Sequence, residues 1–219
     1  MFTAYLRAFG QLFDPRIVKI LGFSVLLSVA VFGLLWSGIA WLLTQSELTS
    51  YWLLEKILDV LGGVATIVTT FFVFPVVVSA TIGLFLESVA RAVEQRHYPD
   101  RKPKGLPLVA GILSSLRFLL KALVVNFVLL LFLFVPVLYP FAWLAANAYL
   151  LSREYFELVA LRHLDPKAAR ELRRSRRLQL FFAGLPAAGL FAVPMVNLIA
   201  PVLVTMAMVH LFERGRRAP

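Results

Sequence analysis

The chain has 219 residues, a net charge of +10 and no cysteine; 60% of its residues are hydrophobic and its mean hydropathy is +0.84. This composition excludes an ordinary soluble domain, which is closer to half apolar, and predicts an integral membrane protein with a single domain, 1–219. The absence of cysteine excludes disulfides, thiolate metal sites and thiol catalysis. In a membrane protein, an excess of cations indicates cytoplasmic loops facing anionic phospholipid rather than nucleic-acid binding.

Residues 1–19 predict a short amphipathic lead-in, with apolar residues at helical spacings of three and four. Aspartate is a favourable helix N-cap and proline a favourable first helical residue, so Asp14 should end the lead-in and a second helix should begin at Pro15. Arg16 and Lys19 lie in the first turn of that helix. They either anchor the chain to lipid headgroups or form an anion site with the free N–H groups at the helix start.

Four runs without Asp, Glu, Lys or Arg follow, and they cover 20–46, 60–86, 122–152 and 178–212. The first two runs hold 27 residues each. They are predicted transmembrane helices, because a bilayer core needs about 20 helical residues. The last two runs hold 31 and 35 residues. Each is too long for one crossing and, as two tight full spans, would supply arms at or below the minimum of about 17 residues.

Prolines interrupt both long runs near their middles. Proline removes a backbone donor and clashes with the preceding turn, so a straight helix is not expected there. Each run is therefore predicted to be a re-entrant helical hairpin. The predicted apex residues are Pro136, Pro140, Pro194, Asn197 and Pro201. Asn197 has two possible roles, satisfying the broken backbone or donating a hydrogen bond to a permeating oxyanion.

The distribution of cations favours these hairpins. Segments 87–121 and 153–177 carry seven and eight cations, whereas the loop 47–59 carries one. If all four runs crossed the membrane, the segment with eight cations would lie outside, against the positive-inside rule. With two spans and two hairpins, 21 of the 22 cations are cytoplasmic. We predict an all-α membrane protein with two full transmembrane helices, two half-spanning hairpins, and cytoplasmic N and C termini.

Within the two basic cytoplasmic segments, a new helix is expected to begin at Ser114. The segment 153–177 carries four arginines at helical spacing. This stripe consists of Arg170, Arg173, Arg174 and Arg177. A stripe of this kind is more often a solvated or headgroup-facing surface than a binding site, and both interpretations stay open at this point.

The sequence contains no pattern typical of an enzyme. His97, His163 and His210 are isolated, without a second ligand at metal-binding spacing. No glycine-rich phosphate loop is present. The four uncharged runs contain no charged residue that could form a proton or sodium relay. We therefore expect no catalytic residue, metal or cofactor, and a channel-like or facilitated route rather than a tightly coupled transporter.

Three stretches in the chain are GLFLESVARAVE, then YFELVALRHLDP leading into ELRRSRRLQLFFAG, and finally VPMVNLIAP. Together and in this order they resemble the CysZ-type sulfate permeases, whose superfamily includes eukaryotic etoposide-induced membrane proteins. The resemblance covers roughly residues 1–212. It implies an α-helical inner-membrane protein with two long transmembrane helices and two pairs of half-penetrating helices. It also implies homo-oligomeric assembly and passage of sulfate into the cytoplasm for cysteine biosynthesis.

The family's anion site lies at the turn between its first two helices, where proline is followed by Gly-Leu and paired arginines. The resemblance carries this site over to Pro15 and Arg16, with Lys19 as a partial substitute. The glycine and the arginine pair are absent here, and Asp14 would repel a dianion unless it stays committed to capping. The predicted ligand is sulfate or a related oxyanion. The alternative is a non-transporting membrane scaffold or regulator with the same fold.

Overall fold

The computed structural model describes residues 2–45, 78, 81, 84–101, 103 and 108–217, which form helices joined by short turns and contain no strand. The loop 47–59 and nearly all of the predicted span 60–86 lie outside the described residues. The chain divides into two compact units, Met1–Ile17 with Leu86–Pro219, and Val18–Phe85. That the whole chain forms one membrane domain stays a prediction.

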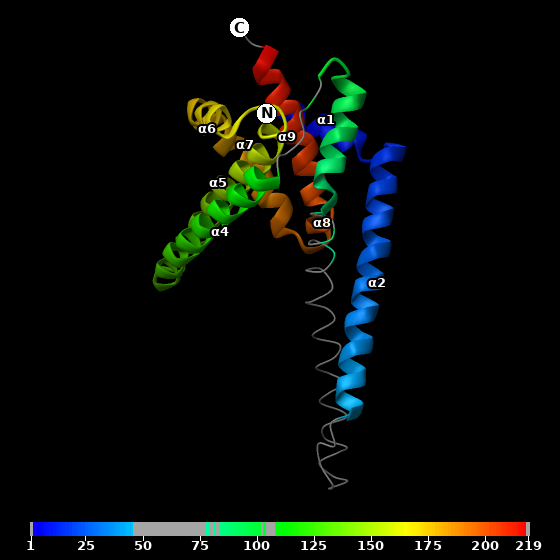
Figure 1. Ribbon diagram of the computed structural model, residues 1–219. Coiled ribbons are helices and arrows are strands. Elements are labelled where there is room, and N and C mark those ends of the chain that lie inside the picture. The colour runs from blue at the N-terminus through cyan, green and yellow to red at the C-terminus, as the bar shows by residue number, and fades with distance from the viewer. Residues whose placement is uncertain are drawn as a thin grey trace. The chain divides into compact units, whose positions relative to one another are not determined.

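Helix α1 spans Phe2–Gln11 (Figure 1). Its face of small and aromatic residues is buried against the rest of the first unit. The Tyr5 hydroxyl donates a hydrogen bond to the Ala183 carbonyl oxygen at 2.7 Å. Leu6, Phe9 and Phe13 are exposed. Part of the apolar face predicted for the lead-in is thus covered by protein, and the other part is exposed.

Helix α2 spans Pro15–Gln45, and Asp14 precedes it as predicted. Asp14 Oδ1 accepts the Arg16 backbone N–H at 2.9 Å, which is the geometry of a helix N-cap. Within the described residues, one helix, over Pro15–Gly38, is long and apolar enough to cross a membrane. This agrees with the first predicted span, while the full number of crossings stays a prediction.

The third uncharged run folds as two helices with a break between them. α4 spans Leu108–Leu131, a short 3₁₀ turn covers Phe132–Phe134, and α5 spans Tyr139–Ala160. Pro136 lies between the 3₁₀ turn and α5, and Pro140 is the second residue of α5. The expected helix start at Ser114 is wrong, because residues 108–113 contain no proline and continue the same helix upstream.

The basic segment and the last run give four more helices. α6 spans Pro166–Ser175, α7 Arg177–Ala192, α8 Pro194–Asn197 and α9 Ala200–Arg217. Asp165 caps α6, since its Oδ1 accepts the backbone N–H groups of Lys167 and Ala168 at 2.9 and 2.8 Å. The last run therefore breaks where its prolines predicted, between α7 and α9.

Helices α5, α7 and α9 form the core of the first unit (Figure 1). α9 is buried almost all round from Ala200 to Glu213. α5 and α7 approach so closely that a Cβ placed on Gly184 would lie 2.0 Å from the Ala148 carbonyl oxygen. Small residues allow such close backbone packing between helices, and this contact fixes where the basic ends of α5 and α7 meet.

Candidate functional site

A buried ion pair joins the helix at residues 84–97 to the turn after α5. The Arg162 guanidinium donates from Nη2 to Glu94 Oε2 at 2.8 Å and from Nε to Glu94 Oε1 at 3.2 Å. Its Nη1 donates to Glu87 Oε1 at 2.9 Å. The side chains of Arg162 and Glu94 are 1% and 2% exposed, so both charges are removed from water. Such a pair is retained only when the hydrogen bonds on both sides are made.

His163 and Glu213 extend this pair into a buried ion cluster, here defined as Glu94, Arg162, His163 and Glu213. His163 Nε2 lies 2.9 Å from Glu94 Oε1 and 3.9 Å from Glu213 Oε1. Glu213, on α9, is fully buried, and neither of its carboxylate oxygens has a hydrogen-bond partner. Arg101 Nε lies 3.2 Å from Glu213 Oε2 and provides its nearest cation. The cluster therefore brings α9 together with the helix at residues 84–97 and the turn after α5, and Arg101 adds a further contact to α9.

The charge of Glu94 follows from these partners. Burial alone would raise the pKa of the Glu94 carboxyl, but the hydrogen bonds from His163 and Arg162 outweigh burial and lower that pKa. Glu94 is thus an anion at neutral pH, and its charge is already committed to the cluster. Glu87 and Glu213 lie beside the other arginines near Glu94, since Glu87 pairs with Arg91 and Glu213 with Arg101.

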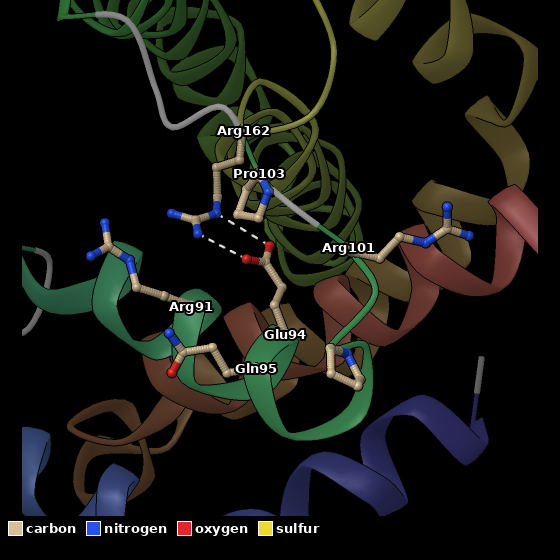
Figure 2. Close-up of a pocket in the computed structure, with 7 residues that line it drawn as sticks. Arg91, Glu94, Gln95, Arg101, Pro103 and Arg162 are labelled. Carbon is tan, nitrogen blue, oxygen red and sulfur yellow. Dashed lines mark hydrogen bonds and ion pairs between the residues drawn. The ribbon is translucent and has the colours of Figure 1, made fainter.

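A cavity of about 420 Å³ opens beside the ion cluster (Figure 2). Its lining residues are Arg91, Glu94, Gln95, Pro99, Arg101, Pro103 and Arg162. Figure 2 shows Glu94 and Arg162 pointing toward each other, while Arg91 and Arg101 extend to either side. Three guanidinium groups line the cavity with one carboxylate, which makes it suited to an anion with several oxygens.

The residues predicted for the anion site lie at the start of α2. Pro15, Arg16 and Lys19 are exposed there. Asp14 accepts the Arg16 N–H and pairs with Arg96, and the Arg16 backbone bond lowers the pKa of the Asp14 carboxyl. Asp14 therefore acts as the helix cap. This is the condition under which its charge would not repel an anion at Arg16. Anion binding at Pro15, Arg16 and Lys19 stays a prediction.

The predicted apex residues of the two hairpins lie at or beside helix breaks. Pro194 is the first residue of α8, and Pro201 is the second residue of α9. Asn197 ends α8, and its Oδ1 is buried without a hydrogen-bond partner. That oxygen does not satisfy the backbone in this structure. Contact between the apex residues and a permeating ion stays a prediction.

The interpretation of the three histidines as isolated is wrong. The rings of His97 and His210 lie 5.4 Å apart, and His210 Nδ1 is 2.9 Å from the Tyr98 hydroxyl. His163 belongs to the ion cluster. Among the residues that the structure describes, no group of three metal-ligating side chains converges. His210 joins α9 by hydrogen bonds to Gln11 and Tyr98, and His163 is hydrogen-bonded to Glu94, whereas His97 contacts the His210 ring.

Sequence reasoning did not identify the ion cluster or the cavity as a site. Glu94 lies 68 residues before Arg162 in the chain, so no local spacing joins them. A signal was nevertheless present: the stretches GLFLESVARAVE and YFELVALRHLDP, which support the family resemblance, carry Glu87, Glu94, Arg162 and His163. The motifs that resemble the family are the ones that meet in space.

Comparison with known proteins agrees with that resemblance. The sequence model of the family described as sulfate transporter CysZ/etoposide-induced protein 2.4 matches residues 4–201. The match covers most of the chain and confirms the predicted resemblance. The comparison with curated proteins found no match. Helix α9 continues past the end of the family match, so Glu213 belongs to the part of the chain outside it.

Proposed function

Because the chain belongs to the sulfate transporter CysZ/etoposide-induced protein 2.4 family, we propose that it is an oxyanion permease that takes sulfate. In this proposal it lies in the cell inner membrane and supplies sulfate to the cytoplasm for cysteine biosynthesis. It acts as a transporter and not as an enzyme, and it assembles as a homo-oligomer. Its two basic segments and both termini face the cytoplasm.

The observation that best supports this proposal is the arginine-lined cavity of Figure 2. Arginine offers five N–H donors in a rigid fork that suits the oxygens of sulfate. The Arg101 side chain is 36% exposed, and its ion pair with Glu213 uses Nε, so its terminal nitrogens lie on the outer part of the group. Arg101 can therefore offer its terminal nitrogens to an anion arriving from water while its Nε stays beside Glu213.

The ion cluster holds Arg162 in the wall of the cavity. Arg162 cannot leave Glu94 without stranding a buried carboxylate, which would cost several kcal/mol. Arg91 is 61% exposed and pairs with Glu87 only at the surface, where such a pair contributes about 0–1 kcal/mol. In the proposed mechanism, Arg91 exchanges its weak surface pairing for the ligand and Arg101 offers its terminal nitrogens while its Nε stays beside Glu213, whereas Arg162 stays fixed. The cavity thus binds an anion without holding it so tightly that it cannot leave.

The second candidate is a non-transporting scaffold or regulator with the same fold. It is favoured by the ion cluster, because a buried network that joins α9 to the helix at residues 84–97 and to the turn after α5 would stabilise the fold without any transport role. The two candidates differ in one measurable property. A permease conducts sulfate when it is the only protein in the bilayer, and a scaffold does not.

Sulfate uptake by proteoliposomes separates these candidates. Purified full-length protein is reconstituted, and radiolabelled sulfate uptake is compared with that of protein-free liposomes. We expect uptake well above the empty liposomes, and a fall of about tenfold in Arg101→Gln, since a hydrogen bond to a charged group contributes about 1.5–3 kcal/mol. Arg170→Gln is the matched control, because it removes the same charge from an exposed position outside the cavity.

Arg16→Ala tests the site carried over from the family resemblance. If uptake falls in Arg16→Ala but not in Arg101→Gln, the ion enters at the start of α2 and not at the cavity. If the wild type takes up no more sulfate than empty liposomes across a range of pH, the permease proposal is lost and the scaffold alternative gains.

A further inference from the structure

A second basic hollow lies between α5 and the start of α7. It is lined by Tyr149, Ser152, Arg153, Arg173, Arg177, Leu180 and Phe181, and it encloses about 50 Å³. This α5–α7 hollow shares no lining residue with the cavity of Figure 2. It divides the arginine stripe: Arg173 and Arg177 line the hollow, whereas Arg170 and Arg174 are exposed outside it.

Arg153 is the buried donor of the hollow. Its side chain is 5% exposed, and its Nε donates to Glu157 Oε1 at 3.1 Å. Its Nη1 is buried without a hydrogen-bond partner. A buried charged donor left unpaired is costly, and such groups in native proteins usually have a partner. Arg153 lines the hollow, which indicates that the missing partner of its nitrogen is a ligand.

The hollow carries more positive than negative charge. Arg173 Nε lies 3.2 Å from the same Glu157 Oε1 that Arg153 contacts, without the geometry of a hydrogen bond. One carboxylate thus serves two guanidinium groups, and Arg177 adds a third. Lys121 is also near, since burial and then the charges of Arg153 and Arg173 lower the pKa of its ammonium group. The hollow therefore attracts an anion.

Helix α7 adds backbone donors beside these side chains. Arg177 is the first residue of α7, a helix of 16 residues, and the capping residue Arg176 makes no side-chain hydrogen bond to its first turn. The N–H groups of a first turn have no intrahelical acceptors and carry the positive end of the helix dipole. Guanidinium groups and helix N–H groups converging on one place form the usual environment of a phosphate or sulfate group.

The position of the hollow along the chain indicates its depth. Ser152 is the last residue of the third uncharged run, and Arg177 directly precedes the fourth. In the predicted topology, both residues lie where apolar chain meets the cytoplasmic headgroup layer. A lipid phosphate occupies that layer at all times, whereas free sulfate or phosphate must come from solution.

We propose that the α5–α7 hollow binds one tetrahedral oxyanion through Arg153, Arg173 and Arg177, and that this group is the phosphate of an anionic phospholipid. Free inorganic phosphate or sulfate offers the same chemistry and is the competing source. The site does not depend on the proposed sulfate transport, since it uses other residues and another cavity. A bound lipid there joins α5 to the α6–α7 junction.

Lipid retention by matched double variants tests this proposal. Delipidated full-length protein in a neutral detergent is titrated with phosphatidylglycerol, and bound lipid is counted by native mass spectrometry. A second arm uses phosphatidylcholine, and a third uses inorganic phosphate or sulfate. Arg173→Gln with Arg177→Gln removes two charges from the hollow, and Arg170→Gln with Arg174→Gln removes two charges from the same stretch of chain outside it.

We expect one phosphatidylglycerol to bind the wild type more tightly than phosphatidylcholine does. Its affinity should fall at least tenfold in the hollow variant, because each charged hydrogen bond contributes a factor of about ten or more, and should stay close to wild type in the control. If inorganic phosphate or sulfate binds through the same arginines and phosphatidylglycerol does not, the site stands and its lipid source is overturned.

Equal loss of phosphatidylglycerol in both double variants would show attraction by net charge alone and would overturn the site. Unchanged binding in the hollow variant would overturn it as well. Size-exclusion profiles establish that both variants are folded. If the hollow variant fails to fold, the single variant Arg177→Gln, at an exposed position, replaces it. Its binding of phosphatidylglycerol is compared with that of Arg174→Gln, and the same results support or overturn the site.

Discussion

Arg162 and Glu94 form a two-point ion pair, with nitrogen–oxygen distances of 2.8 and 3.2 Å, although both residues are almost completely buried. Two hydrogen bonds between a guanidinium group and a carboxylate fix the relative orientation of the two side chains as well as pairing their charges. The turn after α5 is thereby held against the helix at residues 84–97, and the arginine-lined cavity keeps its shape.

Removing Arg162 should destabilise the protein strongly. Arg162→Met leaves Glu94 buried without its main partner, which costs about 3–5 kcal/mol. Thermal unfolding of the detergent-purified protein should show a large fall in the midpoint. Exposed Arg170→Met should stay within about 0.5 kcal/mol of wild type. Adding Glu94→Met to Arg162→Met should restore much of the loss, and a double variant no better than the single one would contradict the pairing.

The same ion pair predicts a loss of stability in acid. The pKa of Glu94 is lowered in the folded protein from its ordinary value of 4.5. A group with a lowered folded pKa stabilises the protein above its unfolded pKa and loses that contribution as the pH falls through the folded value. Thermal midpoints measured from pH 7 downward should therefore fall below about pH 4.5. Glu94→Gln should make the fall of the midpoint with decreasing pH shallower. If the fall is the same in Glu94→Gln, other carboxyl groups cause it.

Gly184 should not tolerate a larger residue. A Cβ at this position would lie 2.0 Å from the Ala148 carbonyl oxygen and 2.7 Å from its carbon, so Gly184→Ala must push α7 away from α5. We expect a loss of about 1–3 kcal/mol from overpacking. Gly189, on the same helix, has nothing within 4 Å of an added Cβ. Gly189→Ala should be neutral or stabilising by up to about 1 kcal/mol, which makes it the matched control in the same thermal assay.

Cysteine labelling should locate the basic segments on the cytoplasmic side. The natural chain has no cysteine, so single substitutions report without background. Ser175 and Gly215 variants should react with a membrane-impermeant maleimide in inside-out vesicles and not in intact spheroplasts, whereas Ser46→Cys should show the opposite pattern. Labelling of Ser175→Cys from outside would exclude the two re-entrant hairpins, since it would place the segment 153–177 outside the membrane.

Local rules predicted the start of α2 and the breaks in the two long uncharged runs. Asp14 and Asp165 each precede a proline, and each caps the helix that follows. The breaks around Pro136 and Pro194 follow from the missing proline N–H. The start of α4 was misplaced although Pro107 directly precedes Leu108, because the prediction gave weight to Ser114 and not to this proline.

The candidate sites could not be predicted in the same way, because they depend on residues far apart in sequence. Glu94, Arg162 and Glu213 come from three different segments, and their meeting depends on how the helices pack. Reading Arg170, Arg173, Arg174 and Arg177 as one stripe likewise concealed their division, since only Arg173 and Arg177 line the hollow beside α5. The spacing of residues along a helix shows which of them share a face, but it does not show which other helix packs against that face.

The turn at residues 161–165 has a consequence for anyone altering this chain. It joins two helices and carries Arg162, His163 and the cap Asp165, so it resembles an ordinary surface connection in which tags, protease sites or extra residues are usually accepted. Because Arg162 and His163 are buried in the ion cluster, lengthening this turn by even one residue would change their register against Glu94. The connection is therefore as intolerant of insertion as the middle of a core helix.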